Sequence, residues 1–101
     1  MAVADTARRN RCAPILVTPA PVFRTNPDAE AHRQHNRARA HAAAQAAGYL
    51  LDLDTLWGTG ATPNIYRRRY DWGDQMHPNG AACAAAARVL APMLQQILGR
   101  L

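Results

Sequence analysis

The chain has 101 residues, 49% of them hydrophobic, and a formal net charge of +5 at pH 7. This length allows one domain at most, with room for a small core. All twelve basic residues are arginine, and nine of them lie in three dispersed clusters without zinc-finger spacing or an RNP-like motif, so we expect a solvated basic surface and no nucleic-acid partner.

The N-terminal residues 2–10 are biased toward polar side chains and could form a short helix. They lack the apolar run that a signal peptide requires, and no segment approaches the roughly 18 apolar residues of a membrane span. We therefore expect a cytoplasmic protein by default, and secretion only if the natural start lies upstream of Met1.

The apolar, β-branched run from Ala13 to Thr18 predicts the first strand, which Pro19 ends. Continuous apolar runs are typical of strands that are buried on both faces of a parallel sheet.

The next predicted element is a helix from Pro27 to about Ala47. Asn26 is a favourable N-cap, Pro27 suits the first helical position, and Gly48 suits a left-handed C-cap. Alanine lies on several sides of this helix, so its buried face is difficult to assign. We expect that face to contain Asn36, Ala40, Ala43 and Ala47.

A second strand over Tyr49–Leu53 completes a strand–helix–strand unit. Such a unit predicts a parallel strand pair with a right-handed crossover. A long loop follows, from about Thr55 to Asn79, and loops of this length are usually functional or disordered.

The last predicted element is a helix that begins near Asn79 and contains Pro92, so we expect a kink or a break near Ala91. Its apolar residues recur at a spacing of three to four. The predicted buried face consists of Cys83, Ala86, Val89, Leu90, Met93, Leu94 and Ile97.

The loop contains the candidate chemistry, a carboxylate at Asp74 three residues before His77. Pro78 directs His77 toward extended geometry, so both side chains can project from one loop toward a common point, as an acid and a base that serve a nucleophile must. The chain contains no serine.

Together with Pro78-Asn79, the alanine-rich helix after it and the strand–helix–strand unit before it, this block resembles the last conserved block, Asp-x-x-His-Pro, of the SGNH/GDSL family of ester hydrolases. The resemblance implies an α/β fold, namely a partial three-layer flavodoxin-like domain over residues 1–101 that corresponds to the C-terminal portion of the family. It also implies that His77 is the general base of a Ser-His-Asp mechanism, that Asp74 orients and charges it, and that the substrate is a small acyl or acetyl ester. No cofactor is implied.

The family's blocks with the nucleophile and the oxyanion hole lie upstream and have no counterpart here, so we expect the isolated chain to be inactive. Two function classes remain open: the C-terminal half of an ester hydrolase, and a non-catalytic remnant or interaction module. Leu, Ile, Val and Phe provide only 17 residues, just under the roughly 20% below which disorder becomes a concern. We therefore expect a marginally stable chain that pairs with a missing N-terminal half or with copies of itself.

Other residues are assigned no site. Cys12 precedes the first strand and Cys83 is expected to be buried and inert, so neither suits a nucleophile, and nothing indicates a disulfide between them. The remaining residues that we considered are His32, His35 and His41, which complete no zinc spacing; Asp52 and Asp54, at a strand end; and Trp57, Tyr66, Tyr70 and Trp72, which could line an acyl or sugar pocket or cover exposed core.

Overall fold

The structure is a computed structural model. It describes residues 9, 12–21, 27–61 and 64–99. The predicted helix over residues 2–10 and the predicted N-cap Asn26 fall outside these residues, apart from Arg9. In chain order the elements are β1 (Leu16–Val17), α2 (Pro27–Ala47), β2 (Leu50–Leu51), α3 (Leu53–Trp57), the 3₁₀ helix η1 (Arg68–Tyr70) and α4 (Gly80–Gly99).

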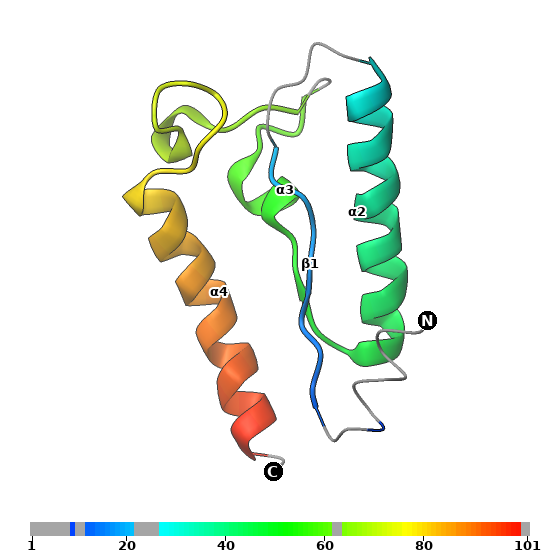
Figure 1. The fold of residues 1–101 in the computed structure, drawn as a ribbon. Helices are drawn as coiled ribbons and strands as arrows, with labels where there is room; N and C mark the ends of the chain where they lie inside the picture. Colours follow the sequence, from blue (N-terminus) through cyan, green and yellow to red (C-terminus); the bar gives the residue numbers. More distant parts are fainter. Residues whose placement is uncertain (1–8, 10–11, 22–26, 62–63, 100–101) are drawn as a thin grey trace.

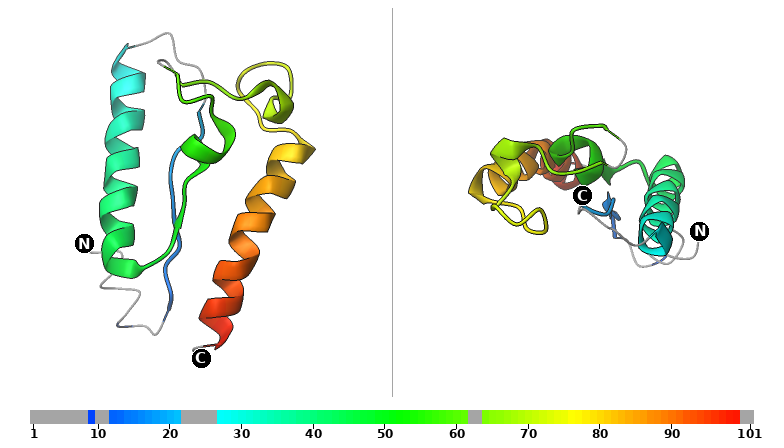
Figure 2. Two further views of the ribbon diagram at one scale, coloured as in Figure 1. Left: turned by 180° about the vertical axis from the view of Figure 1, so that it is seen from behind. Right: turned by 90° about the horizontal axis from the view of Figure 1, so that it is seen from above.

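The predicted parallel strand pair is confirmed. β1 and β2 run parallel, with Leu16 opposite Leu50 and Val17 opposite Leu51, and α2 forms the crossover between them. α2 and α4 lie on opposite sides of the pair (Figures 1 and 2), which gives the helix–sheet–helix layering of an α/β fold. Both strands are shorter than predicted. β2 ends early because a second helix, which the sequence analysis did not anticipate, begins two residues after it.

That second helix is α3, and it begins inside the predicted strand. The side chain of Asp52 accepts a hydrogen bond from the Thr55 backbone N–H at 3.1 Å and so caps the helix. With η1 farther along, α3 gives regular structure to a segment that we expected to be one long loop.

The buried face of α2 differs in part from the prediction. Its buried side chains are Arg33, Ala40, Ala43 and Ala44. Ala40 and Ala43 are therefore predicted correctly, whereas Asn36 is exposed and the side chain of Ala47 lies outside the described part. The face is rotated toward Arg33 because that guanidinium has a buried carboxylate partner across the interface, which hydrophobic periodicity does not reveal.

The prediction for α4 was wrong at several positions. Ala82 and Ala85 are its buried residues, whereas Cys83, Val89 and Leu94 are exposed. The orientation is set at the first turns, where the indole N–H of Trp57 donates to the Ala82 carbonyl at 2.9 Å. The helix also runs from Gly80 to Gly99 without the break expected near Pro92.

By length and composition alone, α4 is the one described helix that could cross a membrane, with 11% of its most apolar window buried. Helices in the cores of folded domains meet the same criterion. The start of α4 lies in such a core, which consists of Trp57, Tyr66, Tyr70, Ala82 and Ala85.

The aromatic residues of this core settle an interpretation that the sequence left open. Trp57 and Tyr66 lie with ring centroids 6.1 Å apart, and Tyr70 is buried beside them. These three rings fill the space between α3, η1 and α4, whereas Trp72 is 73% exposed.

The expectation of a β1 buried on both faces was wrong, because Val17 is 50% exposed in the two-stranded sheet of the described residues.

Candidate active site

The loop of residues 72–77, between η1 and α4, carries the predicted pair. Its ends are joined by an antiparallel bridge between Asp71 and Pro78 and by a hydrogen bond from the Trp72 N–H to the His77 carbonyl at 3.0 Å. Asn79 follows and caps α4, because its Oδ1 accepts the Ala82 N–H at 3.0 Å. The loop is therefore held to the first turn of a helix that is itself packed on the core.

Asp74 and His77 are brought into direct contact. His77 Nδ1 lies 2.5 Å from Asp74 Oδ2, and the other carboxylate oxygen accepts the backbone N–H groups of Met76 at 2.9 Å and His77 at 3.0 Å. Both side chains remain in solvent, with 68% of the His77 side chain and 40% of the Asp74 side chain exposed.

The hydrogen bond from the His77 side chain, followed by that from the Met76 backbone, lowers the pKa of Asp74 to about 2. Asp74 is thus a carboxylate throughout the neutral range and can only accept hydrogen bonds. The Nδ1 atom of His77 must therefore carry the proton between them. Nε2 has no hydrogen-bond partner among the described residues and is available as a proton acceptor.

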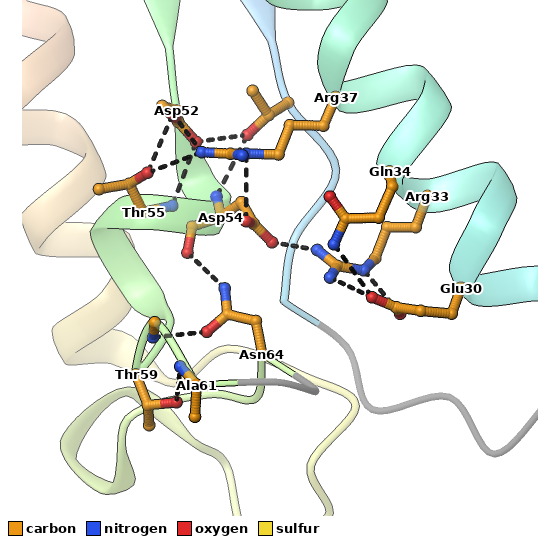
Figure 3. A network of polar contacts seen from close by, with 12 residues as sticks. Glu30, Arg33, Gln34, Arg37, Asp52, Asp54, Thr55, Thr59, Ala61 and Asn64 are labelled. Carbon is orange, nitrogen blue, oxygen red and sulfur yellow. Dashed lines mark hydrogen bonds and ion pairs between the residues drawn. The ribbon is translucent and has the colours of Figure 1, made fainter. Parts of the chain in front are cut away.

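A second polar cluster lies at the carboxyl ends of the two strands, on the side facing α2 (Figure 3). Asp54 is buried on α3 and pairs with Arg33, and the Arg37 Nε lies 3.2 Å from its other oxygen. Glu30 completes the pairing of Arg33 through contacts of 3.0 and 2.6 Å. The Glu30 hydrogen bonds raise the pKa of Arg33 against the opposing effect of burial, with the Asp54 charge adding to the rise.

Asp52 is the second carboxylate of this cluster. It accepts hydrogen bonds from Thr55 and from the Thr18 hydroxyl at 3.1 Å, and His41 Nε2 lies 2.9 Å from it. Burial would raise the pKa of Asp52, but the hydrogen bonds from Thr55 and Thr18 and the charge of Arg37 lower it. The ends of β1 and β2 are thereby joined to α2 and α3.

The sequence analysis missed these carboxylates, since it assigned Asp52 and Asp54 no site. A signal was available in the arginines at Arg33 and Arg37, which share one face of α2 at a spacing of four. The two acids that follow the strand and the two arginines of the preceding crossover helix are equal in number and opposite in charge. Predicting which of them pair would have required the geometry of the crossover.

The segment after α3 is held by a glycine and an asparagine that were also missed. Asn64 donates to the Asp54 carbonyl at 3.0 Å and accepts the Gly60 N–H at 2.7 Å. A Cβ at Gly58 would collide with both the Asp54 carbonyl and the Asn64 amide, so only glycine fits there. Beside them lies a pocket of about 310 Å³ whose lining includes Gln34, Arg37, Asn64 and Arg67.

The other candidate residues lie apart from the pair. Cys12 and Cys83 form no disulfide with each other, and Cys83 is exposed rather than buried as predicted. His32 and His35 are exposed, while His41 contacts Asp52. Within the described ranges, no group of three His, Cys, Asp or Glu residues is placed to hold a metal ion.

Comparison with known proteins gives one structural match. The chain superposes on the crystal structure of a GDSL-like lipase from Bacteroides thetaiotaomicron with a TM-score of 0.72 and 24% sequence identity. The match covers 99% of this chain and 49% of the lipase chain, so the chain spans about half the length of that protein. No family model and no curated protein matches. The likeness shows that the chain has the fold of part of a GDSL-like lipase.

Proposed function

We propose that this chain is the C-terminal part of an SGNH/GDSL-type ester hydrolase, with His77 as its general base and Asp74 as the residue that orients it. The supporting observation is the 2.5 Å contact between His77 Nδ1 and Asp74 Oδ2, which leaves Nε2 available, on a chain with the fold of part of a GDSL-like lipase.

In this proposal a serine hydroxyl from another polypeptide segment lies next to His77 Nε2. The ring accepts the hydroxyl proton as the oxygen attacks the ester carbonyl, and the Asp74 carboxylate stabilises the resulting imidazolium. The same ring then returns the proton to the leaving alcohol. Because this chain has no serine, it would lose on the order of 10⁶-fold in turnover when alone, by analogy with nucleophile removal in a serine protease.

The complementing segment would add to the outer edge of β1. The Leu16 and Thr18 N–H groups donate to the carbonyls of Tyr49 and Leu51 at 3.1 and 3.0 Å, so the intervening Val17 directs its backbone groups to the opposite edge. Val17 is also half exposed, and α4 exposes Val89, Leu94 and Leu98. A further parallel strand with its covering side chains would satisfy the β1 edge and bury apolar surface.

The second candidate is a non-catalytic remnant or interaction module with the same fold fragment. It is favoured by the absence of serine and by the high exposure of the Asp74–His77 pair. Copies of the chain would then cover the open strand edge.

The two candidates are separated by reading the nucleotide sequence upstream of Met1 for a Gly-Asp-Ser block and expressing that segment with this chain, in cis or as a second polypeptide. We expect hydrolysis of a short-chain aryl ester by the combination, none above background by the chain alone, and loss of hydrolysis in His77→Ala. Arg39→Ala, at an exposed position of α2, is the control with unchanged activity. Hydrolysis by the chain alone that survives His77→Ala would place the chemistry on other residues.

A further inference from the structure

Asp71 lies outside the Asp-x-x-His block, three residues before Asp74, at the base of the loop. Its backbone pairs with Pro78, and its carbonyl accepts a hydrogen bond from the Asn79 side chain at 3.2 Å. Asn79 in turn caps α4 through Ala82. Asp71 is therefore anchored to the folded core, whereas the loop beyond it is exposed over most of its length.

The Asp71 carboxylate points into this loop. Its Oδ1 accepts the backbone N–H groups of Gly73 at 3.1 Å and Gln75 at 3.0 Å, and its Oδ2 accepts the Gln75 side-chain amide at 2.8 Å. These contacts lie on both sides of Asp74. The Gln75 N–H belongs to the peptide group that joins Asp74 to Gln75, so Asp71 holds the backbone on which the Asp74 side chain stands.

The loop needs such a restraint because its conformation is unfavourable in isolation. Gln75 has a φ of 58°, in the left-handed region that residues with a Cβ rarely adopt, and Gly73 has a φ of 129°. A strained backbone of this kind persists only when surrounding contacts enforce it. The three hydrogen bonds to Asp71 are contacts of that kind.

We propose that Asp71 is a positioning residue for the Asp74–His77 pair. It fixes the loop so that Asp74 Oδ2 faces His77 Nδ1, while Asp74 Oδ1 accepts hydrogen bonds from the backbone N–H groups of Met76 and His77. The proposal rests on the proposed function only in treating the pair as catalytic. The geometry can be tested on the chain as it exists, without any activity.

The test uses NMR of the Asp71→Ala and Asp71→Asn chains. In the wild type we expect neutral His77 to carry its proton on Nδ1 and Asp74 to titrate near pH 2. Asp71→Ala should give a mixture of the two ring tautomers and raise the pKa of Asp74 toward the ordinary value of 3.8.

Asp71→Asn should restore the wild-type signature. Its Oδ1 can still accept both backbone amides, and its amide group can donate to the Gln75 Oε1, which is buried without a hydrogen-bond partner in the described part of the chain. Asp28→Ala, which removes an exposed carboxylate from α2, is the charge-matched control and should leave the His77 tautomer unchanged.

A merely structural role would lower the unfolding midpoint of Asp71→Ala without changing the tautomer, and that result would overturn the proposal. If Asp71→Ala fails to fold, Gln75→Ala decides, because it removes only the contact to Asp71 Oδ2: a raised Asp74 pKa supports the proposal and an unchanged one overturns it. If Asp71→Ala changes the His77 tautomer but the wild-type chain, combined with the upstream segment, does not hydrolyse the ester, the positioning role of Asp71 stands and only the proposed function is refuted.

Discussion

Trp57 donates its indole N–H to the carbonyl oxygen of Ala82 at 2.9 Å, and this hydrogen bond joins α3 to the first turn of α4. Trp57 is 6% exposed and Ala82 is fully buried. The loop that carries Asp74 and His77 connects to α4 just before this point. The orientation of the candidate site relative to the strands therefore depends on a contact between residues 25 positions apart.

Replacing Trp57 by Phe should remove this hydrogen bond and part of the core volume. Loss of the bond alone corresponds to about 0.5–1.5 kcal/mol, and the smaller ring adds to the loss. Urea unfolding should show a lower midpoint for Trp57→Phe. The matched control is Trp72→Phe at a 73% exposed position, which should stay within about 0.5 kcal/mol of the wild type; equal effects of the two changes would contradict the packing described here.

Arg33→Met should leave the buried Asp54 carboxylate with Arg37 as its remaining partner on α2. Breaking a buried ion pair from one side costs up to about 3–5 kcal/mol, and Arg37 offsets part of that cost, so we expect a clear loss of unfolding free energy. Circular dichroism and denaturant titration measure the effect. Arg39→Met changes the same charge on the exposed face of α2 and should be nearly neutral. A folded Arg33→Met chain with unchanged stability would show that the Asp54 contact does not hold α2 in place.

Gly58→Ala tests the close approach at the end of α3. The added Cβ would collide with the Asp54 backbone carbonyl and the Asn64 amide, and such overpacking costs about 1–3 kcal/mol. Gly99→Ala is the control, because nothing lies within 4 Å of a Cβ there and alanine favours the helix by up to about 1 kcal/mol. The prediction fails if both variants have the same unfolding free energy.

The pH dependence of the loop follows from the pKa of Asp74, which is lowered from 3.8 to about 2 by the His77 hydrogen bond and the backbone amides. Because the folded chain binds this proton less readily than the unfolded chain, the stabilising contribution is fully present above about pH 3.8 and is lost as the pH falls through 2. The Asp74 carboxyl carbon, followed by NMR, should show this transition. His77→Ala removes the largest cause of the shift, so its transition should move to higher pH; an unmoved transition would contradict the assigned cause.

The elements with strong local signals were predicted from the sequence. Pro27 and Gly48 set the ends of α2, the apolar runs at Leu16 and Leu50 gave a parallel pair, and Pro78 after His77 indicated a loop that brings His77 to Asp74. The ends of α2 and the loop at His77 depend on φ restrictions and helix caps within a few residues, so neighbouring residues were sufficient to predict them. The parallel pairing followed from the order strand–helix–strand, because a crossover helix joins parallel strands.

The tertiary structure decided which faces are buried and which charges meet. Cys83 turned outward and Ala82 inward because the Trp57 indole N–H donates to the Ala82 carbonyl, and Asp54 became a buried carboxylate because Arg33, 21 residues earlier, lies across from it. A pattern that is rich in alanine has no strong apolar stripe to specify rotation. The orientation of both long helices was therefore set by partners distant in sequence, which local periodicity does not encode.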